Sequence, residues 1–424
     1  GLIAPDAGTL SWPATGERPS DIGFVFQDAT LMPWARVADN VHLPLKLAGV
    51  PKEKAGPRIM DALARVGLAD FANAFPRELS GGMKMRVSIA RALVTEPPVL
   101  LMDEPFAALD EFTREKLDDD LLDLWTAQRF TTVFVTHSIH GHLRRGQRRP
   151  ARRGYVMSRD ETFFARLLRI LVPIAVGIAF LVLWEVLVRA SGIRPFVLPA
   201  PSVIAESLAA NFTSLMGSLW VTLRVTIAAF LLAVVGGVGL AILFSQSRHV
   251  EMAFFPYAVV LQVTPIVSIA PLILIWVGYD RVELALLILA WVAAFFPILS
   301  NTTLGLRSAD HNLRDLFRLY GASRWQVLTE LQLPSALPYI LAGMKISGGL
   351  ALIGAVVAEF VAGSGAATGL AWRIVEAGNR LDIPRMFAAL FLLSALGIAI
   401  FFALTLLESR LLRRWHESAI RREG

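Results

Sequence analysis

Three short stretches in residues 1–140 carry groups that suit phosphate and metal chemistry. Ser80-Gly81-Gly82 stands immediately before a helical run, and a hydroxyl with unpaired backbone N–H groups at a helix start binds anions such as phosphate. Asp103 and Glu104 follow the apolar run Val99–Met102, and carboxylates at the end of a buried parallel strand can hold Mg²⁺ and orient water. His137 follows another apolar run. Together the stretches indicate a site for a phosphorylated ligand and a metal ion.

Each stretch also has an ordinary structural explanation. Ser-Gly-Gly is a common helix start, two acids at a strand end are often solvated surface, and a lone histidine there is often structural. The residue types alone leave both explanations open, so the choice between them depends on the order and spacing of the stretches.

The elements that must position these residues follow an α/β pattern. The runs Ile22–Phe26, Val99–Met102 and Thr131–Val135 are typical of short buried parallel strands, and Lys52–Gly67 and Arg114–Gln128 have the periodicity of amphipathic helices. We therefore expect a partial α/β domain over residues 1–140.

The order of the motifs resembles that of ATP-binding cassette (ABC) ATPases. The resemblance implies a Q-loop residue, a signature, a Walker B strand end, a D-loop residue and a switch histidine, which are in chain order Gln27, Ser80 with Gly81 and Gly82, Asp103 with Glu104, Asp110, and His137. It further implies that Asp103 and Gln27 hold Mg²⁺, that Glu104 polarises the attacking water, and that His137 stabilises the phosphoryl group of ATP. The signature residues and Asp110 would contact the nucleotide of an opposite cassette.

The sequence departs from that family in three ways. It contains no G-x-x-x-x-G-K-[ST] phosphate loop, and Gly1–Leu10 resembles the family segment that follows this loop, so we expect an incomplete cassette. Met85 stands where the family usually has glutamine. Beyond His140 the chain becomes rich in arginine, which we interpret as a linker over residues 141–162, a pattern expected of a frame-shifted gene fusion.

The chain as a whole is too apolar for a soluble protein, and its long apolar runs lie in the C-terminal part. Hydrophobic residues make up 55% of the chain and charged residues 18%, with a mean hydropathy of +0.55, which excludes a purely soluble protein. The absence of cysteine excludes disulfide frameworks and thiolate metal sites. We expect an all-α permease domain over residues 163–424 with six membrane-spanning helices. The predicted spans are Leu167–Val188, Leu219–Phe244, Met252–Val277, Val282–Leu299, Leu337–Val361 and Met386–Leu407.

Arginines predict the orientation of these spans. Nine arginines lie between Arg144 and Arg169, four between Arg307 and Pro334, and five after Glu408. Positive charge favours the cytoplasmic side, so both termini and the loop around residue 320 are expected to face the cytoplasm. Among ionisable residues inside the spans, we expect Glu185 and Lys345 to reach the membrane surface, whereas Arg224 and Glu359 either line a pathway or pair within the bundle.

One cytoplasmic loop carries a motif of its own. Gly321 ends a run that begins at Asp315, and the segment Leu331-Gln332-Leu333-Pro334 follows after nine further residues. This pattern resembles the coupling loop of binding-protein-dependent permeases, with Asp-Leu-Phe in place of the usual Glu-Ala-Ala. An exposed apolar knob at Leu316, Phe317 and Leu319 would dock on an ATPase, and the alternative is an amphipathic helix on the membrane surface. The candidate coupling residues are Asp315, Leu316, Phe317, Gly321, Leu331, Leu333 and Pro334.

Both halves most resemble importers of the nitrate, sulfonate and taurine type. The resemblance implies a permease in the bacterial inner (plasma) membrane that imports small organic or inorganic anions and carries an incomplete cassette, with ATP and Mg²⁺ bound only in complex with an intact cassette. The expected partners are a second permease chain, an ABC ATPase subunit, a periplasmic or tethered solute-binding protein and the lipid bilayer, but no nucleic acid. Two alternatives stay open. In the first, the chain is a working ATPase whose phosphate loop lies upstream. In the second, residues 1–140 are a non-catalytic docking remnant or a gene-fusion artefact.

Overall fold

The computed structural model describes residues 22–105, 126, 131–135, 163–362 and 369–413. These residues belong to two compact units. The first contains the N-terminal domain together with Leu304–Pro338 and the chain from Glu408, and the second contains residues 147–303 and 339–407. Predictions for the helix at Arg114–Gln128 and for the linker lie outside the described residues, apart from Thr126.

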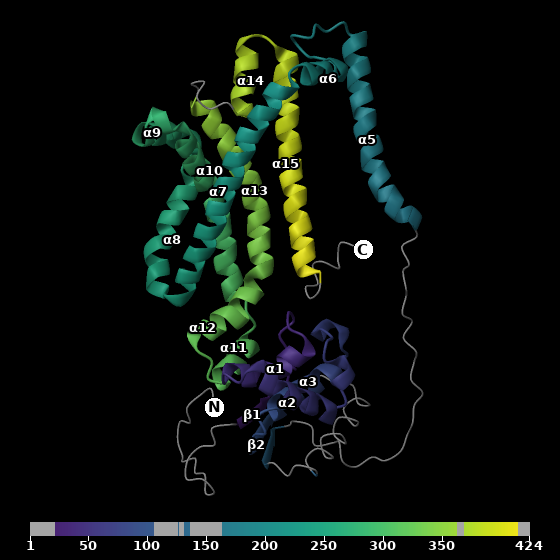
Figure 1. Ribbon diagram of the computed structural model, residues 1–424, viewed down its shortest axis with the longest axis vertical. Helices are drawn as coiled ribbons and strands as arrows, with labels where there is room; N and C mark the ends of the chain where they lie inside the picture. The colour runs from purple at the N-terminus through teal and green to yellow at the C-terminus, as the bar shows by residue number, and fades with distance from the viewer. Residues whose placement is uncertain (1–21, 106–125, 127–130, 136–162, 363–368, 414–424) are drawn as a thin grey trace. The chain divides into compact units, whose positions relative to one another are not determined.

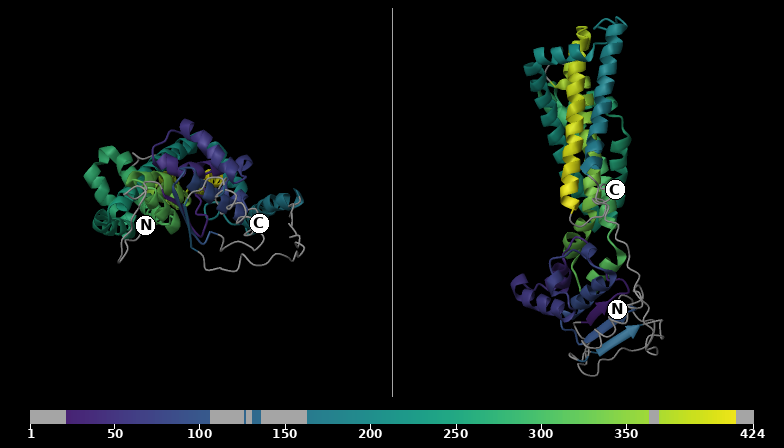
Figure 2. Two further views of the ribbon diagram at one scale, coloured as in Figure 1. Left: turned by 90° about the horizontal axis from the view of Figure 1, so that it is seen from below. Right: turned by 90° about the vertical axis from the view of Figure 1, so that its right-hand side faces the viewer.

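A three-stranded parallel sheet organises the N-terminal domain. Its strands are β1 (Ile22–Val25), β2 (Val99–Asp103) and β3 (Thr131–Val135), in the order β1-β2-β3. In the register, Val25 pairs with Met102 and Asp103 pairs with Val135. The strands lie side by side in the right-hand view of Figure 2. The predicted strands therefore exist, with ends that differ from the prediction by at most one residue.

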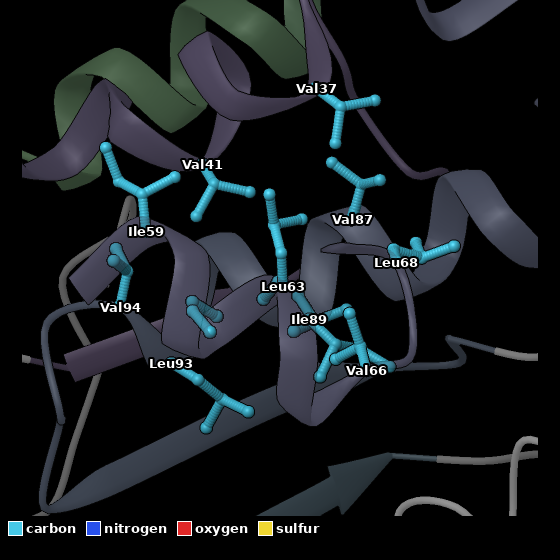
Figure 3. Packing of buried hydrophobic residues seen from close by; sticks show 14 of the residues in the cluster. Val37, Val41, Ile59, Leu63, Val66, Leu68, Val87, Ile89, Leu93 and Val94 are labelled. Atoms are coloured by element: carbon cyan, nitrogen blue, oxygen red, sulfur yellow. The ribbon is translucent and has the colours of Figure 1, made fainter. Parts of the chain in front are cut away.

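Three helices pack against one another in this domain, and the third of them also contacts β1. They are α1 (Val37–Leu47), α2 (Lys52–Arg65) and α3 (Gly81–Leu93). Their apolar faces meet in one cluster that also contains Val25 and Leu100 from the strands. Figure 3 shows side chains from the three helices pointing toward one another. Each large side chain buried there contributes about 1.5–3 kcal/mol, so the helices that carry the motif residues are firmly held.

The Leu304–Pro338 segment, called here the 304–338 loop, contains two short helices and a π-helix. α11 (His311–Leu319) is capped by Asp310, whose Oδ1 accepts a hydrogen bond from Leu313 N at 3.1 Å. α12 (Arg324–Gln326) begins at Ser323 and continues as the π-helix Val327–Gln332 into α13 (Leu333–Ala362). The sequence predicted a helix, a glycine turn and a second helix, but not the π-helical segment, because a π-helix is rare and has no residue signature of its own.

The second unit consists of long apolar helices (Figure 1). In the described residues, five helical segments are long and apolar enough to cross a membrane. They include α5 (Phe163–Ala190), α7 (Phe212–Gln246), α10 (Val282–Arg307), α13 and α15 (Ile383–Leu412). Two shorter helices, α6 (Pro201–Ala210) and α14 (Leu370–Asn379), were not predicted.

The span predicted at Met252–Val277 is not one straight helix. It is divided into α8 (Arg248–Val263) and α9 (Ile266–Val277), which meet at 104°. Pro265 supplies no N–H for a continuing helix and disfavours helical backbone at Thr264, which has a ψ of 122°. The expected six spans therefore hold only if this bent pair counts as one.

Small residues let the central membrane helices approach closely. A Cβ atom added at Gly354 on α13 would lie 2.9 Å from Ala290 Cα on α10. One added at Gly237 on α7 would lie 2.9 Å from Ile298 Cγ2, also on α10. Helices in a bilayer gain packing energy from such contacts, so α7, α10 and α13 form a tight core.

Candidate functional site

The predicted signature residues lie at the start of α3. Ser80 is the N-cap of this helix, with extended backbone, and its Oγ accepts a hydrogen bond from Met83 N at 3.3 Å. Ser80 and Gly81 are exposed and Gly82 is buried. Met85 packs in the core. The helix start thus presents backbone N–H groups to solvent, an arrangement suited to an anion.

Two of the predicted metal-binding residues follow neighbouring parallel strands. Gln27 comes two residues after β1, and Asp103 ends β2, so both lie at the carboxyl edge of the sheet. Both residues are exposed. Glu104 has a φ of 42°, and its N–H donates to Val135 O at 2.9 Å, which turns the chain sharply after the strand. Carboxylate and amide oxygens at this edge fit Mg²⁺ chemistry.

The predicted nucleotide site is only partly described. Asp110 and His137 lie outside the described residues. Within the described part of the chain, no group of three His, Cys, Asp or Glu residues is arranged to hold a metal ion. The roles of these residues remain predictions.

An apolar interface joins the 304–338 loop to the N-terminal domain. Leu316 and Phe317 of α11 have no exposed surface and pack with Met32 and Leu43 of the N-terminal domain. Half-buried Trp34, Leu47 and Tyr320 pack around them. We call this interface the docking face, whose buried members are Met32, Leu43, Ala309, Leu313, Leu316, Phe317 and Leu331.

Local hydrogen bonds shape the groove side of the docking face. Asn40 on α1 is fully buried; its Oδ1 accepts from Met32 N at 2.8 Å, and its Nδ2 donates to Met32 O and Ala35 O. The Asn40 side chain thus pairs with the backbone N–H and C=O of Met32 and the C=O of Ala35, which need partners because buried backbone polar groups are rarely left unpaired. Asn40 therefore places Met32 beneath α11.

Two polar contacts border the docking face. Lys46 Nζ lies 2.6 Å from Glu330 Oε2, and Gln326 Nε2 donates to Leu47 O at 3.1 Å. Both join the end of α1 to the segment around the π-helix. Exposed ion pairs contribute little energy, so these contacts set the register of the interface, whereas the apolar side chains supply most of its stability.

The turn after α11 depends on Gly321. Gly321 has a φ of 67°, Gly321 N donates to Arg318 O at 3.0 Å, and Ala322 N donates to Phe317 O at 2.9 Å. A Cβ atom at Gly321 would meet nothing within 4 Å. The glycine is therefore required for its left-handed backbone and not for close approach to another element.

The other candidate coupling residues divide into two groups. Asp315 is buried on α11 and pairs with His311 and Arg318 of the same helix. Leu331 lies in the docking face, whereas Leu333 and Pro334 begin α13. The predicted knob at Leu316 and Phe317 is thus packed in a groove of the N-terminal domain, and Leu319 stands half-buried outside the cluster.

Comparison with known families matches both halves of the chain. Residues 1–107 match the family "ABC transporter", and residues 233–413 match "Binding-protein-dependent transport system inner membrane component". The chain joins part of an ABC transporter ATPase to a permease domain. The predicted mixed fold and family resemblance are therefore confirmed, and the N-terminal domain is hereafter the cassette.

Individual relatives match the cassette. The taurine import ATP-binding protein TauB of Rhizobium johnstonii is 46% identical over 161 residues, which are 37% of this chain and 62% of that protein. The nitrate import ATP-binding protein NrtD of Synechocystis sp. is 43% identical over 143 residues, which are 33% of this chain and 53% of that protein. The chain thus spans between 53% and 62% of the length of these curated relatives.

Ionisable groups of the permease domain are paired. Arg224 Nη2 lies 2.5 Å from Glu283 Oε1, and Glu185 accepts from Arg189 and Ser202. Glu359 is 1% exposed; its Oε1 accepts from Thr222 Oγ1 at 2.8 Å and its Oε2 from Ala371 N at 2.9 Å. For Arg224 and Glu359, the structure shows pairing within the bundle.

Sequence reasoning missed Arg91 of α3, which is completely buried. Its Nη1 donates to Thr30 O at 2.6 Å, and its Nη2 donates to Ala29 O at 3.2 Å. A signal was present, because Arg91 is the one charged residue in the otherwise apolar and small stretch Val87–Val94. A charge in such a stretch indicates a buried, hydrogen-bonded side chain.

Proposed function

We propose that this chain is the membrane-spanning permease of an ATP-driven bacterial importer for small organic or inorganic anions. Membership of the ABC transporter family implies nucleotide binding in general. The substrate class is supported by relatives whose names specify taurine and nitrate import. A second permease chain, an intact ABC ATPase and a solute-binding protein complete the proposed assembly.

The observation that carries this proposal is the docking face. Leu316 and Phe317 belong to the matched permease domain, and they are buried against Met32 and Leu43 of the matched cassette. Side chains that interlock in this way transmit displacement between segments, since a packed interface deforms little. The 304–338 loop is therefore proposed to couple movement of a cassette to the membrane helices.

Nucleotide chemistry is assigned to the same assembly. When bound, ATP with Mg²⁺ supplies the free energy of phosphoryl transfer. Asp103 and Gln27 lie at adjacent strand ends and are proposed to bind the metal ion, with Glu104 orienting water. The signature residues Ser80, Gly81 and Gly82, together with Asp110, are proposed to contact the nucleotide of an opposite cassette. His137 is proposed to contact the transferring phosphoryl group.

We further propose that both chain termini and the 304–338 loop lie in the cytoplasm, with the bilayer as the inner membrane. The cysteine-free chain allows a direct test. Thiols introduced by Ser323→Cys and Leu381→Cys, both at exposed positions, should react with an impermeant maleimide from opposite sides. Labelling of both from the same side would contradict the proposed topology.

Transport itself is tested in proteoliposomes that contain the chain and the solute-binding protein encoded near its gene. We expect uptake of taurine or nitrate only when an intact ABC ATPase and ATP are also present. ATP-driven uptake without the added ATPase, abolished by Glu104→Gln, would favour the alternative of a self-sufficient ATPase. No uptake of either anion under any condition, with the chain inserted and folded, would favour a non-transporting fusion and contradict the proposal.

A further inference from the structure

Three arginines surround one carboxylate where α14 meets α7 and α15. Glu376 Oε2 accepts from Arg373 Nη1 at 2.7 Å, and Glu376 Oε1 lies 3.0 Å from Arg380 Nη2. Arg373 Nε also donates to Ser218 Oγ on α7 at 3.0 Å. The hydrogen bond from Arg373 and the nearby charges of Arg380 and Arg385 lower the pKa of the Glu376 carboxyl. We call Arg373, Arg380 and Arg385 the arginine cluster, and it already holds one anionic group.

Arg385 uses few of the donors on its guanidinium. Its Nη2 lies 3.4 Å from Ser214 Oγ on α7, longer than an ordinary hydrogen bond, and its Nε is buried with no partner among the described residues. Asp382 Oδ1 accepts instead from the backbone N–H of Arg385, at 3.3 Å. Buried donors normally have partners, so Arg385 is able to bind a further acceptor without losing a hydrogen bond of its own.

Charge and exposure indicate which ligand fits the arginine cluster. Its three positive charges exceed the two negative charges of Glu376 and Asp382. The Arg380 side chain is 67% exposed, whereas those of Arg373 and Glu376 are 22% and 18% exposed. A dissolved anion therefore reaches the cluster from the Arg380 side and enters a region where water screens charges less. Because a guanidinium binds two oxygens of one anion side by side, the ligand class indicated is a small oxyanion such as nitrate or a sulfonate.

We propose that the arginine cluster is a binding site for a small oxyanion, and that the Glu376 carboxylate competes with this ligand for the same guanidiniums. This inference rests on the proposed function, in which the chain imports anions of this class. α13 leads over 30 residues from the 304–338 loop toward α14, so the proposed topology puts the site on the outer side of the membrane. Because Glu376 carries the charge and oxygen atoms of the ligand, it limits the affinity and allows the anion to leave again.

The test measures modification of Arg380 by phenylglyoxal in the full chain, quantified by mass spectrometry. Nitrate and methanesulfonate should each slow this modification, compared with chloride at the same ionic strength. Arg281 is the matched control within the same molecule, because its side chain is 71% exposed and also lies beside a carboxylate, with Nε 3.7 Å from Asp280 Oδ2. Equal protection of Arg380 and Arg281, or no protection of Arg380 by either anion, would overturn the inference. This comparison needs no variant.

Two variants separate a binding site from a purely structural group of ion pairs. Glu376→Gln removes the competing charge, so the nitrate concentration that gives half-protection of Arg380 should fall about tenfold. Arg385→Gln removes the unused donors and should raise that concentration about tenfold, as for the loss of one charged hydrogen bond. An unchanged or higher concentration for Glu376→Gln would show that the carboxylate only holds the arginines in place, and would contradict the inference.

The inference and the proposed function fail in different ways. Protection of Arg380 requires neither ATP nor a solute-binding protein. Protection in a chain that transports neither nitrate nor taurine would therefore contradict the proposed function alone. Transport without selective protection of Arg380 would contradict the arginine cluster alone.

Discussion

The docking face and the start of α14 each hold a helix against a neighbour, but with opposite chemistry. At the docking face, Leu316 and Phe317 are buried among apolar side chains, with the exposed pair Lys46–Glu330 at the border. At α14, the buried Glu359 carboxylate accepts from Ala371 N, and Thr222 Oγ1 accepts from Leu370 N at 2.9 Å.

This difference indicates which contact is able to open. Separating an apolar face exposes surface to water but leaves no polar group without a partner, since solvent satisfies Lys46 and Glu330. Separating α14 from Glu359 and Thr222 removes the donor of Glu359 Oε2 and leaves the N–H groups of Leu370 and Ala371 unsatisfied within a membrane domain. The docking face is therefore suited to repeated dissociation, and the Glu359 contact to permanent attachment.

The strongest expected effect is at the docking face. Phe317→Ala removes a fully buried ring and should weaken docking by about 3–5 kcal/mol, whereas Leu319→Ala on the same helix, outside the cluster, should change it by less than about 1 kcal/mol. Docking is measured as the yield of thiol cross-linking between Lys46→Cys and Glu330→Cys. Equal yields in the two variants would show that the apolar cluster does not hold the loop.

The next effect concerns Glu359. Glu359→Gln keeps the size of the side chain but turns one acceptor into a donor, so we expect a loss of about 1.5–3 kcal/mol in unfolding free energy. Glu283→Gln is the control, because it breaks an exposed ion pair with Arg224 and should cost less than about 1 kcal/mol. Thermal unfolding in detergent measures both. A Glu359→Gln midpoint equal to that of the control would remove the contrast between the two regions.

The sequence predicted those elements that have a local residue pattern. Short apolar runs predicted β1, β2 and β3, and the resemblance carried by Gly321 and the Leu-x-Leu-Pro segment predicted the helix, turn and second helix of the 304–338 loop. It did not find the break at Pro265, because hydropathy counts side chains and not backbone donors. It also did not find Arg91 or the partners of Glu359, because pairing between residues such as Thr222 and Glu359, 137 positions apart, leaves no local pattern.

A smaller effect tests the turn that presents the docking face. Gly321→Val forces a β-branched side chain into left-handed backbone, at about 1–2 kcal/mol. Because a Cβ atom there meets open space, Gly321→Asn should retain most of the docking, whereas Gly321→Val should reduce both cross-linking and uptake. Ser335→Ala, just past Pro334 in α13, should leave both unchanged. A loss for asparagine as large as that for valine would indicate steric exclusion instead of backbone strain.

The smallest effect belongs to the ion pair at the border of the docking face. Lys46 and Glu330 side chains are 48% and 33% exposed, so solvent screens their attraction, and Glu330→Gln should weaken docking by less than about 1 kcal/mol. Salt should remove this difference, since the Debye length falls from about 10 Å at 0.1 M to about 3 Å at 1 M. Dissociation is measured by protection of an Ala309→Cys thiol, which is buried in the docking face, at both salt concentrations, with Lys46→Met as the matched variant on the other partner. If Glu330→Gln weakened docking as much as Phe317→Ala, or if its effect persisted at 1 M salt, the pair would be a principal part of the interface, and the docking face would resemble the Glu359 contact more closely than its apolar burial indicates.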